Sequence, residues 1–151
     1  MRFMILRKSD HNMETGTLPS KQLLAAVGRY NDDLRRAGVL LGGEWLLPSA
    51  TGARINVSGN KVTTTDGPFA EVKELIAGFI LIEVNSKEEA IAWARRCPTM
   101  DGHCEAEMEV RQVFEASDFP PELTYELTRH ASASVAKDAE RLLHAQAAAK
   151  S

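Results

Sequence analysis

The stretch IAGFILIEVNSKEEAIAWARRCP, residues 76–98, encodes a buried strand that leads directly into a helix. Residues 76–84 are almost continuously apolar, which predicts a strand with both faces covered. Ser86 followed by Glu89 is a capping box, and it starts a helix that Cys97-Pro98 ends. The stretch therefore predicts a domain in which helices pack on a sheet.

The segment that follows, EAEMEVRQVF at residues 105–114, alternates strictly between apolar and charged side chains. Such alternation predicts a strand with one dry face and one polar face. The dry face holds Ala106, Met108 and Val110, and the charged face holds Glu105, Glu107, Glu109 and Arg111. A row of charges cannot face a dry core, so that face meets either solvent or a polar cavity.

Upstream of residue 76 the chain predicts a strand, a loop, a helix, an extended segment and a hairpin. The first strand is expected at 2–7, the loop at 9–18, and the helix from Ser20 or Pro19 to Ala37-Gly38. The extended segment spans 39–47, broken at Gly42-Gly43, and the hairpin spans 53–65 with Ile55 and Val57 on a dry face. The hairpin turns at Ser58-Gly59-Asn60. Together with 76–114 the order is β-α-β, hairpin, β-α-β, which predicts an α+β fold of the ferredoxin-like kind.

A ferredoxin-like sheet with helices on one face leaves its second face open, and a homodimer joined through the two sheets would cover it. A last helix is expected from Pro121 to Ala149, with its own apolar stripe. We expect a domain at residues 1–116 and a helical extension at 117–151 that packs across the dimer partner or onto the outer helices.

Composition narrows the classes of function. With a net charge of -3, neither nucleic acid nor an anionic membrane is expected as a partner. The two cysteines, Cys97 and Cys104, form no disulfide framework, and no apolar run reaches the length of a membrane span. These features predict a cytoplasmic protein.

The segment DGPFAEVKE at residues 66–74 resembles the signature of the DGPF family, a branch of the YCII-related proteins. The opening strand MRFMIL, the segment YNDDLRRAGVLL (30–41) and SKEEAIAWARRCP (86–98) running on to EVRQV (109–113) agree in order. The resemblance implies a dimeric α+β barrel and, for some members, association with an extracytoplasmic-function sigma factor. A few relatives are enzymes, including a dehydrochlorinase that uses a His/Asp pair. Trp45 departs from the glycine of the family pattern, and His11 lies near the histidine of the wider group.

The signature supplies the first candidate residues. Asp66 is either a helix cap, with Pro68 in the first turn and Phe69 in the core, or a proton acceptor at the mouth of an inter-subunit cavity. Lys73 lies either on a salt-bridged surface, with Glu71 and Glu74, or beside an anionic ligand.

The remaining candidate residues lie on the charged face of the strand at residues 105–114 and at residues 44–45. Glu109 and Arg111 form either a structural ion pair or part of a catalytic cavity with Asp66. Glu44 and Trp45 are candidates for ligand binding in the same cavity, with Trp45 as a stacking wall.

No metal site and no cofactor is expected. The spacing of Cys97, His103 and Cys104 matches no familiar zinc site, and the sequence contains no phosphate loop or dinucleotide fingerprint. Two classes of function remain. One is a small-molecule-binding or regulatory module, and the other is a cofactor-free lyase, isomerase or dehydrohalogenase with carboxylate acid-base chemistry.

Overall fold

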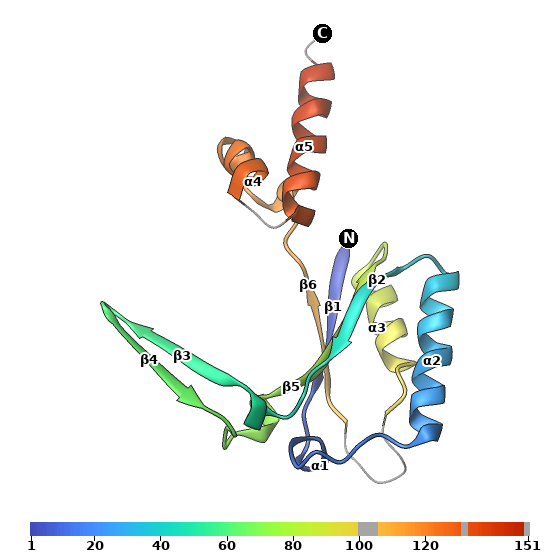
Figure 1. The fold of residues 1–151 in the computed structure, drawn as a ribbon. Helices are drawn as coiled ribbons and strands as arrows, with labels where there is room; N and C mark the ends of the chain where they lie inside the picture. Colours follow the sequence, from blue (N-terminus) through green and yellow to red (C-terminus); the bar gives the residue numbers. More distant parts are fainter. Residues whose placement is uncertain (100–105, 131–132, 150–151) are drawn as a thin grey trace. The chain divides into compact units, whose positions relative to one another are not determined.

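The computed structural model describes residues 1–99, 106–130 and 133–149 (Figure 1). The chain forms two compact units. One comprises Phe3–Arg111, and the other comprises Met1–Arg2 with Gln112–Ser151.

A four-stranded sheet organises the larger unit, with the strand order β2-β5-β1-β6. The strands are β1 (Arg2–Lys8), β2 (Leu40–Trp45), β5 (Ile76–Glu83) and β6 (Met108–Gln112). Two helices, α2 (Lys21–Arg36) and α3 (Lys87–Arg95), connect β1 to β2 and β5 to β6. This order and these connections define a ferredoxin-like α+β fold, as the sequence predicted.

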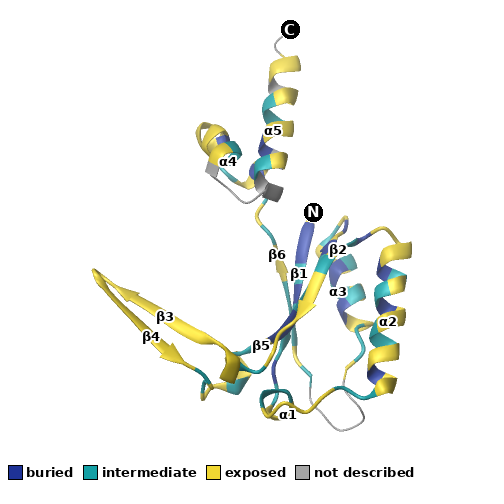
Figure 2. Ribbon diagram, in the orientation of Figure 1, coloured by how far each residue is buried: buried dark blue, intermediate teal, exposed yellow. Residues whose placement is uncertain are grey.

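The hydrophobic core lies between one face of this sheet and the two helices (Figure 2). It contains Phe3, Ile5, Tyr30, Leu34, Val39, Ile82, Val84, Ala90 and Ala94. Met108 and Val110 pack against the same core, which confirms these two positions of the predicted dry face, whereas Ala106 precedes β6 and lines a polar pocket. Phe79 and Leu81 alternate with the inward residues of β5 and are only half-buried. Within one chain the second face of this strand is therefore covered only in part, since Ala77 on that face is buried.

The helix ends follow the local sequence. Ser20 and Ser86 cap α2 and α3, because each hydroxyl accepts a hydrogen bond from the backbone N–H three residues later, at 3.0 and 3.1 Å. Gly38 ends α2 with a φ of 70°, a conformation that glycine adopts without strain. Leu24 lies off the buried stripe of α2 and is 51% exposed.

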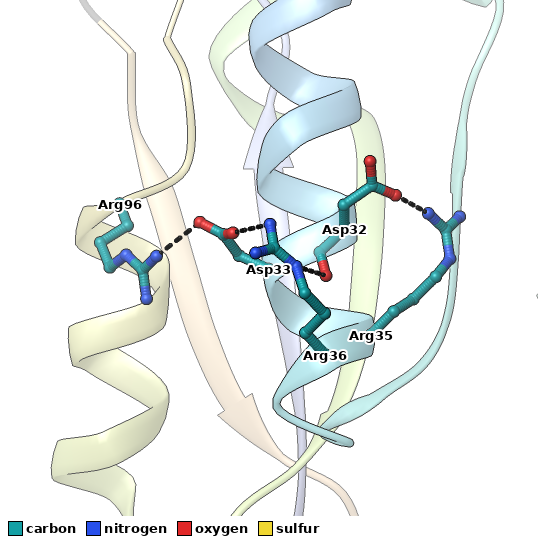
Figure 3. Close-up of polar contacts among 5 residues, drawn as sticks. All are labelled: Asp32, Asp33, Arg35, Arg36 and Arg96. Carbon is teal, nitrogen blue, oxygen red and sulfur yellow. Dashed lines mark hydrogen bonds and ion pairs between the residues drawn. The ribbon is translucent and has the colours of Figure 1, made fainter.

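A buried contact and a surface contact join α2 to α3. The Tyr30 hydroxyl donates a hydrogen bond of 3.0 Å to the carbonyl oxygen of Trp93. On the surface the Asp33 carboxylate accepts from Arg36 at 2.7 Å and from Arg96 at 2.8 Å (Figure 3). Asp33 therefore ties the C-terminal ends of both helices together.

The hairpin β3 (Ala53–Ser58) and β4 (Lys61–Asp66) forms a separate two-stranded sheet. Val57 pairs with Val62 and shares a face with Ile55, as the alternation predicted. That face is not dry, because Ile55, Val57 and Val62 are 67%, 70% and 63% exposed.

Two further expectations for the larger unit are corrected. Residues 9–18 contain a short helix, α1 (His11–Glu14), because the Asp10 carboxylate caps it by accepting from the Met13 N–H at 2.9 Å. Gly42-Gly43 does not end β2, which continues to Trp45, but the pairing of β2 with β5 shifts register between Leu40 and Gly42. A Cβ atom on Gly43 would lie 2.6 Å from the carbonyl oxygen of Phe79, so glycine permits the close strand pairing there.

In the smaller unit the expected single helix from Pro121 to Ala149 is wrong. After a 3₁₀ turn at Pro121–Leu123 the chain forms α4 (Thr124–His130) and α5 (Ala133–Ala148), which pack against each other. A helix pair buries both apolar stripes locally, which one continuous helix cannot do. None of the described helices is long and apolar enough to span a bilayer.

Candidate functional sites

The end of β1 carries two cationic side chains on opposite faces of the sheet. Arg7 follows Ile5 toward the helices, and Lys8 lies on the other face, because successive strand residues alternate. Each residue lines a different pocket. The candidate sites of this unit are therefore an apolar cavity beside Arg7 and a polar pocket beside Lys8.

The apolar cavity lies between the sheet and α2 and measures about 50 Å³. Its walls include Ile5, Val27, Tyr30, Trp45 and Met108. Arg7 is in the wall too, and its Nε is buried without a hydrogen-bond partner. A buried donor without a partner is uncommon in folded proteins, and it marks this position as a candidate site.

Cys97 lines the same cavity as a free thiol. Burial raises the pKa of the Cys97 thiol, although the nearby Arg7 charge acts in the opposite direction. A raised pKa keeps the thiol protonated near neutral pH, so Cys97 contributes an apolar wall and not a nucleophile.

The polar pocket is much larger, about 710 Å³. It is lined by Lys8, Ser9, Asp10, His11, Asn12, Val72, Lys73, Ala106 and Glu107. Lys73 and His11 are exposed side chains with no hydrogen-bond or ion-pair partner among the residues that the structure describes. The structure thus places Lys73, a residue selected from the sequence, in the wall of a pocket of ligand size.

Glu109 and Arg111 lie together on β6, as the alternation predicted. The Arg111 guanidinium donates to Glu109 Oε1 at 3.0 Å, and Lys8 Nζ lies 3.2 Å from Glu109 Oε2. The hydrogen bonds from Arg111 and Lys8 lower the pKa of the Glu109 carboxyl. A carboxylate stabilised in this way is a weak proton acceptor near neutral pH.

Asp66 is the last residue of β4, where it pairs with Ala53 and is exposed. The structure records no contact between Asp66 and Glu109 or Arg111 in the residues it describes. Asp66 is a strand end and not a helix cap, since the next helical turn is η2 at Val72–Glu74.

The residues after Asp66 fold onto the turn at Ser49–Thr51. The N–H of Gly67 donates to the Gly52 carbonyl oxygen at 2.9 Å, and that of Phe69 donates to Ser49 Oγ at 3.1 Å. Phe69 is only half-buried, with the Arg54 guanidinium 4.2 Å from its ring centre. In this chain the segment therefore anchors the base of the hairpin.

Ser49 extends this anchor to α1 through Glu14. The Glu14 carboxylate accepts from Ser49 Oγ at 2.6 Å, from the Ser49 N–H at 3.0 Å and from Ser9 Oγ at 2.9 Å. Burial alone would raise the pKa of Glu14, but the hydrogen bonds from Ser49 and Ser9 lower it overall. The ionised carboxylate holds α1, the turn and the signature segment together.

Glu44 and Trp45 occupy successive positions of β2, opposite Phe79 and Gly78 of β5. Both line the small apolar cavity, and Trp45 is 47% exposed. The ligand-binding candidates from the sequence thus divide between two pockets, because Lys73 lines the other one.

The sequence interpretation missed Arg7 and did not select His11 for the site. Arg7 carries a weak signal, since it is a charge at the inward position of an otherwise apolar strand. For metals, the described residues contain no group of three His, Cys, Asp or Glu side chains that could hold an ion. His103, Cys104 and Glu105 lie outside the described residues.

The fold and its pockets define a ferredoxin-like α+β domain with an open sheet face. The family model of the YCII-related domain matches residues 1–117. The chain belongs to the YCII-related family.

An uncharacterized protein of Rhizobium meliloti (strain 1021) is 42% identical over 50 residues. That match covers 33% of this chain and 40% of the relative, so the chain spans well under two thirds of the length of the relative. Among solved structures, the 5-chloro-2-hydroxyhydroquinone dehydrochlorinase of Burkholderia phenoliruptrix AC1100, in complex with 2,5-dihydroxybenzoquinone, is similar at 15% identity and a TM-score of 0.39. The similarity covers 78% of this chain and 98% of the dehydrochlorinase.

Proposed function

We propose that this chain is a cytoplasmic, homodimeric, small-molecule-binding module of the DGPF branch, and that its ligand occupies the pocket beside Lys73. The observation that carries the proposal is a pocket of about 710 Å³ in which Lys73 and His11 have no partner among the described residues. Ligand pockets in proteins commonly measure about 300–1,000 Å³.

The charges of the pocket indicate the chemistry of the ligand. Lys8 is already paired with Glu109, whereas Lys73 is available as a point positive charge. Asp10 and Glu107 place carboxylates in the same lining, so the pocket suits a polar molecule with both an anionic group and hydrogen-bond donors.

A thermal-shift screen with small acids, phenols and quinols tests the proposal. Compounds that stabilise the protein should lose at least tenfold in affinity in Lys73→Ala and keep it in Lys61→Ala. Lys61 is a matched control, because it is an exposed lysine on the hairpin. Unchanged affinity in Lys73→Ala, or no stabilising compound in a broad library, would reject the pocket as the ligand site.

The homodimer is supported by apolar surface that the larger unit leaves uncovered. Leu41 on β2 is 47% exposed, and Ile55, Val57 and Val62 form an exposed apolar face on the hairpin. Exposed apolar surface marks interaction sites, and most soluble oligomers are built from copies of one chain, which supports a second copy as the partner. Nothing in the geometry or in the matched proteins supports a sigma factor as the partner.

Light scattering tests the dimer with a matched pair of hairpin variants. Val57→Glu places a charge on the apolar face and should shift the protein toward monomer, whereas Asn56→Glu changes the opposite face and should leave the dimer intact. A monomeric wild-type protein would overturn the homodimer. Truncation after Ser117 should weaken the dimer if the C-terminal helices pack on the partner, and an unchanged mass would reject that contact.

The alternative function is a cofactor-free lyase, isomerase or dehydrohalogenase, and the observation in its favour is His11 in the pocket wall. Histidine side chains commonly act as general acids or bases in enzymes. Asp66 and Glu109 remain the carboxylate candidates for such a reaction, with Arg111 as the cation paired to Glu109. Turnover of a bound compound that His11→Asn abolishes while binding persists would establish the enzyme, and binding without turnover would favour the module.

A further inference from the structure

We propose that the apolar cavity beside Arg7 binds a short-chain aliphatic monocarboxylate, whose carboxylate pairs with the Arg7 guanidinium. This site is independent of the pocket beside Lys73, because the two pockets share no lining residue and lie on opposite faces of β1.

The first argument is the unpaired cation. Arg7 Nε is buried without a hydrogen-bond partner, and Arg7 forms no ion pair among the residues that the structure describes. Of the other polar side chains in the wall, the Tyr30 hydroxyl donates to Trp93 and Cys97 Sγ lies 3.9 Å from the Pro98 carbonyl oxygen. The Glu44 carboxylate lies in the same wall and forms no ion pair with Arg7. The Arg7 guanidinium therefore has no ion-pair partner in the described part of the chain, and the carboxylate of a ligand would supply one.

The second argument is the character of the walls. Ile5, Val27, Ala77, Ile80 and Met108 surround the guanidinium with apolar surface. A phosphate group carries more charge than one guanidinium neutralises, and its transfer into apolar surroundings is costly. A carboxylate carries one charge and matches the planar fork of arginine, and an alkyl tail fits the apolar walls.

The third argument is size. The cavity of about 50 Å³ is small. A water molecule requires roughly 10–15 Å³ by the same measure, so the cavity admits roughly three to five heavy atoms. Acetate and propionate are of this size, whereas the tail of a longer acid would reach the half-exposed Trp45.

Trp45 provides the readout. The chain has two tryptophans, so a Trp93→Phe background leaves Trp45 as the single fluorophore, in the wall of the cavity. In this background, formate, acetate, propionate and butyrate are titrated at constant ionic strength, with propionamide as the neutral analogue of propionate.

The expected result is a saturable change in Trp45 fluorescence with acetate and propionate, tighter than with formate, and none with propionamide. Arg7→Met should lower the affinity for propionate at least tenfold. Arg29→Met, which alters an exposed arginine of α2, should leave that affinity unchanged. A cooperative thermal transition in Arg7→Met shows that the variant is folded.

Three results would overturn the proposal. These are no response to any acid, an equal response to propionamide, and retained propionate affinity in folded Arg7→Met. Propionate binding that is lost in Lys73→Ala but kept in Arg7→Met would move the acid to the other pocket, so the two proposals succeed or fail separately.

Discussion

Replacement of Arg7 by methionine should stabilise the ligand-free protein. A buried donor without a partner costs about 1–3 kcal/mol, and a residue of similar shape without that donor avoids the cost. Only Nε of the Arg7 guanidinium is both buried and unpaired, so the low end of the range applies. We expect the free energy of unfolding to rise by about 1 kcal/mol, which corresponds to about 2–4 °C in Tm for a chain of this size.

The assay is thermal and urea unfolding, followed by circular dichroism in a buffer free of carboxylic acids. The urea midpoint should rise, while the slope of the unfolding free energy against urea concentration stays the same. An unchanged slope shows that stability has changed and that the surface exposed on unfolding has not. Arg29→Met is the control, because Arg29 is exposed and its replacement should change stability by less than about 0.5 kcal/mol.

The same thermal unfolding is repeated with propionate in the buffer. A ligand that binds the folded state raises the Tm, so saturating propionate should stabilise the wild-type protein and not Arg7→Met. A lower Tm for Arg7→Met in the absence of ligand would refute the reasoning, since it would show that the guanidinium stabilises the fold.

Three further predictions concern the framework of the larger unit. Glu14→Gln should lower the free energy of unfolding by about 1 kcal/mol at pH 7. The pKa of Glu14 is lowered in the folded state, so the ionised carboxylate stabilises the protein above the unfolded pKa of about 4.3. As the pH falls through the lower pKa of the folded state, the difference in stability between the wild type and Glu14→Gln should disappear. Urea unfolding across this pH range would show it. Gly67→Ala should destabilise the protein by about 2 kcal/mol or more, because its Cβ would overlap the Ser49 carbonyl group, whereas Gly52→Ala should be tolerated in the same thermal melts. Tyr30→Phe should lower the free energy of unfolding by about 1 kcal/mol, because it removes the hydrogen bond to the Trp93 carbonyl oxygen. Asp33→Asn should lower it by less than about 0.5 kcal/mol and only at low salt, because it removes exposed ion pairs. Unfolding at two salt concentrations distinguishes the two effects.

The sheet and its two helices were predictable because their signals are local. Ser20 and Ser86 cap helices through contacts three residues away, and the alternation of residues 105–114 separates Met108 from Glu109 without reference to the rest of the chain. Such patterns depend only on the geometry of one element.

The sites were less predictable because they depend on contacts between distant segments. The cavity beside Arg7 requires β1, α2, β2 and β6 to meet, and nothing near residue 7 in the sequence indicates that meeting. Lys73 reaches a pocket only because the turn before β5 lies against the end of β1, where the Ser9 N–H donates to the Leu75 carbonyl oxygen at 2.9 Å. The exposure of the hairpin was likewise missed, since alternation identifies an apolar face but not what covers it.

The β3–β4 hairpin provides a direct way to follow assembly. Its twelve residues are all exposed, so in a single chain its backbone amides are protected only by the hydrogen bonds of an isolated two-stranded ribbon. Such amides should exchange with deuterium within seconds, whereas amides of the core strands exchange only when the unit opens. A partner seated on the hairpin would slow its exchange while leaving the core unchanged. The exchange rate of the hairpin amides therefore reports the fraction of chains in complex, without an attached fluorophore or a mutation.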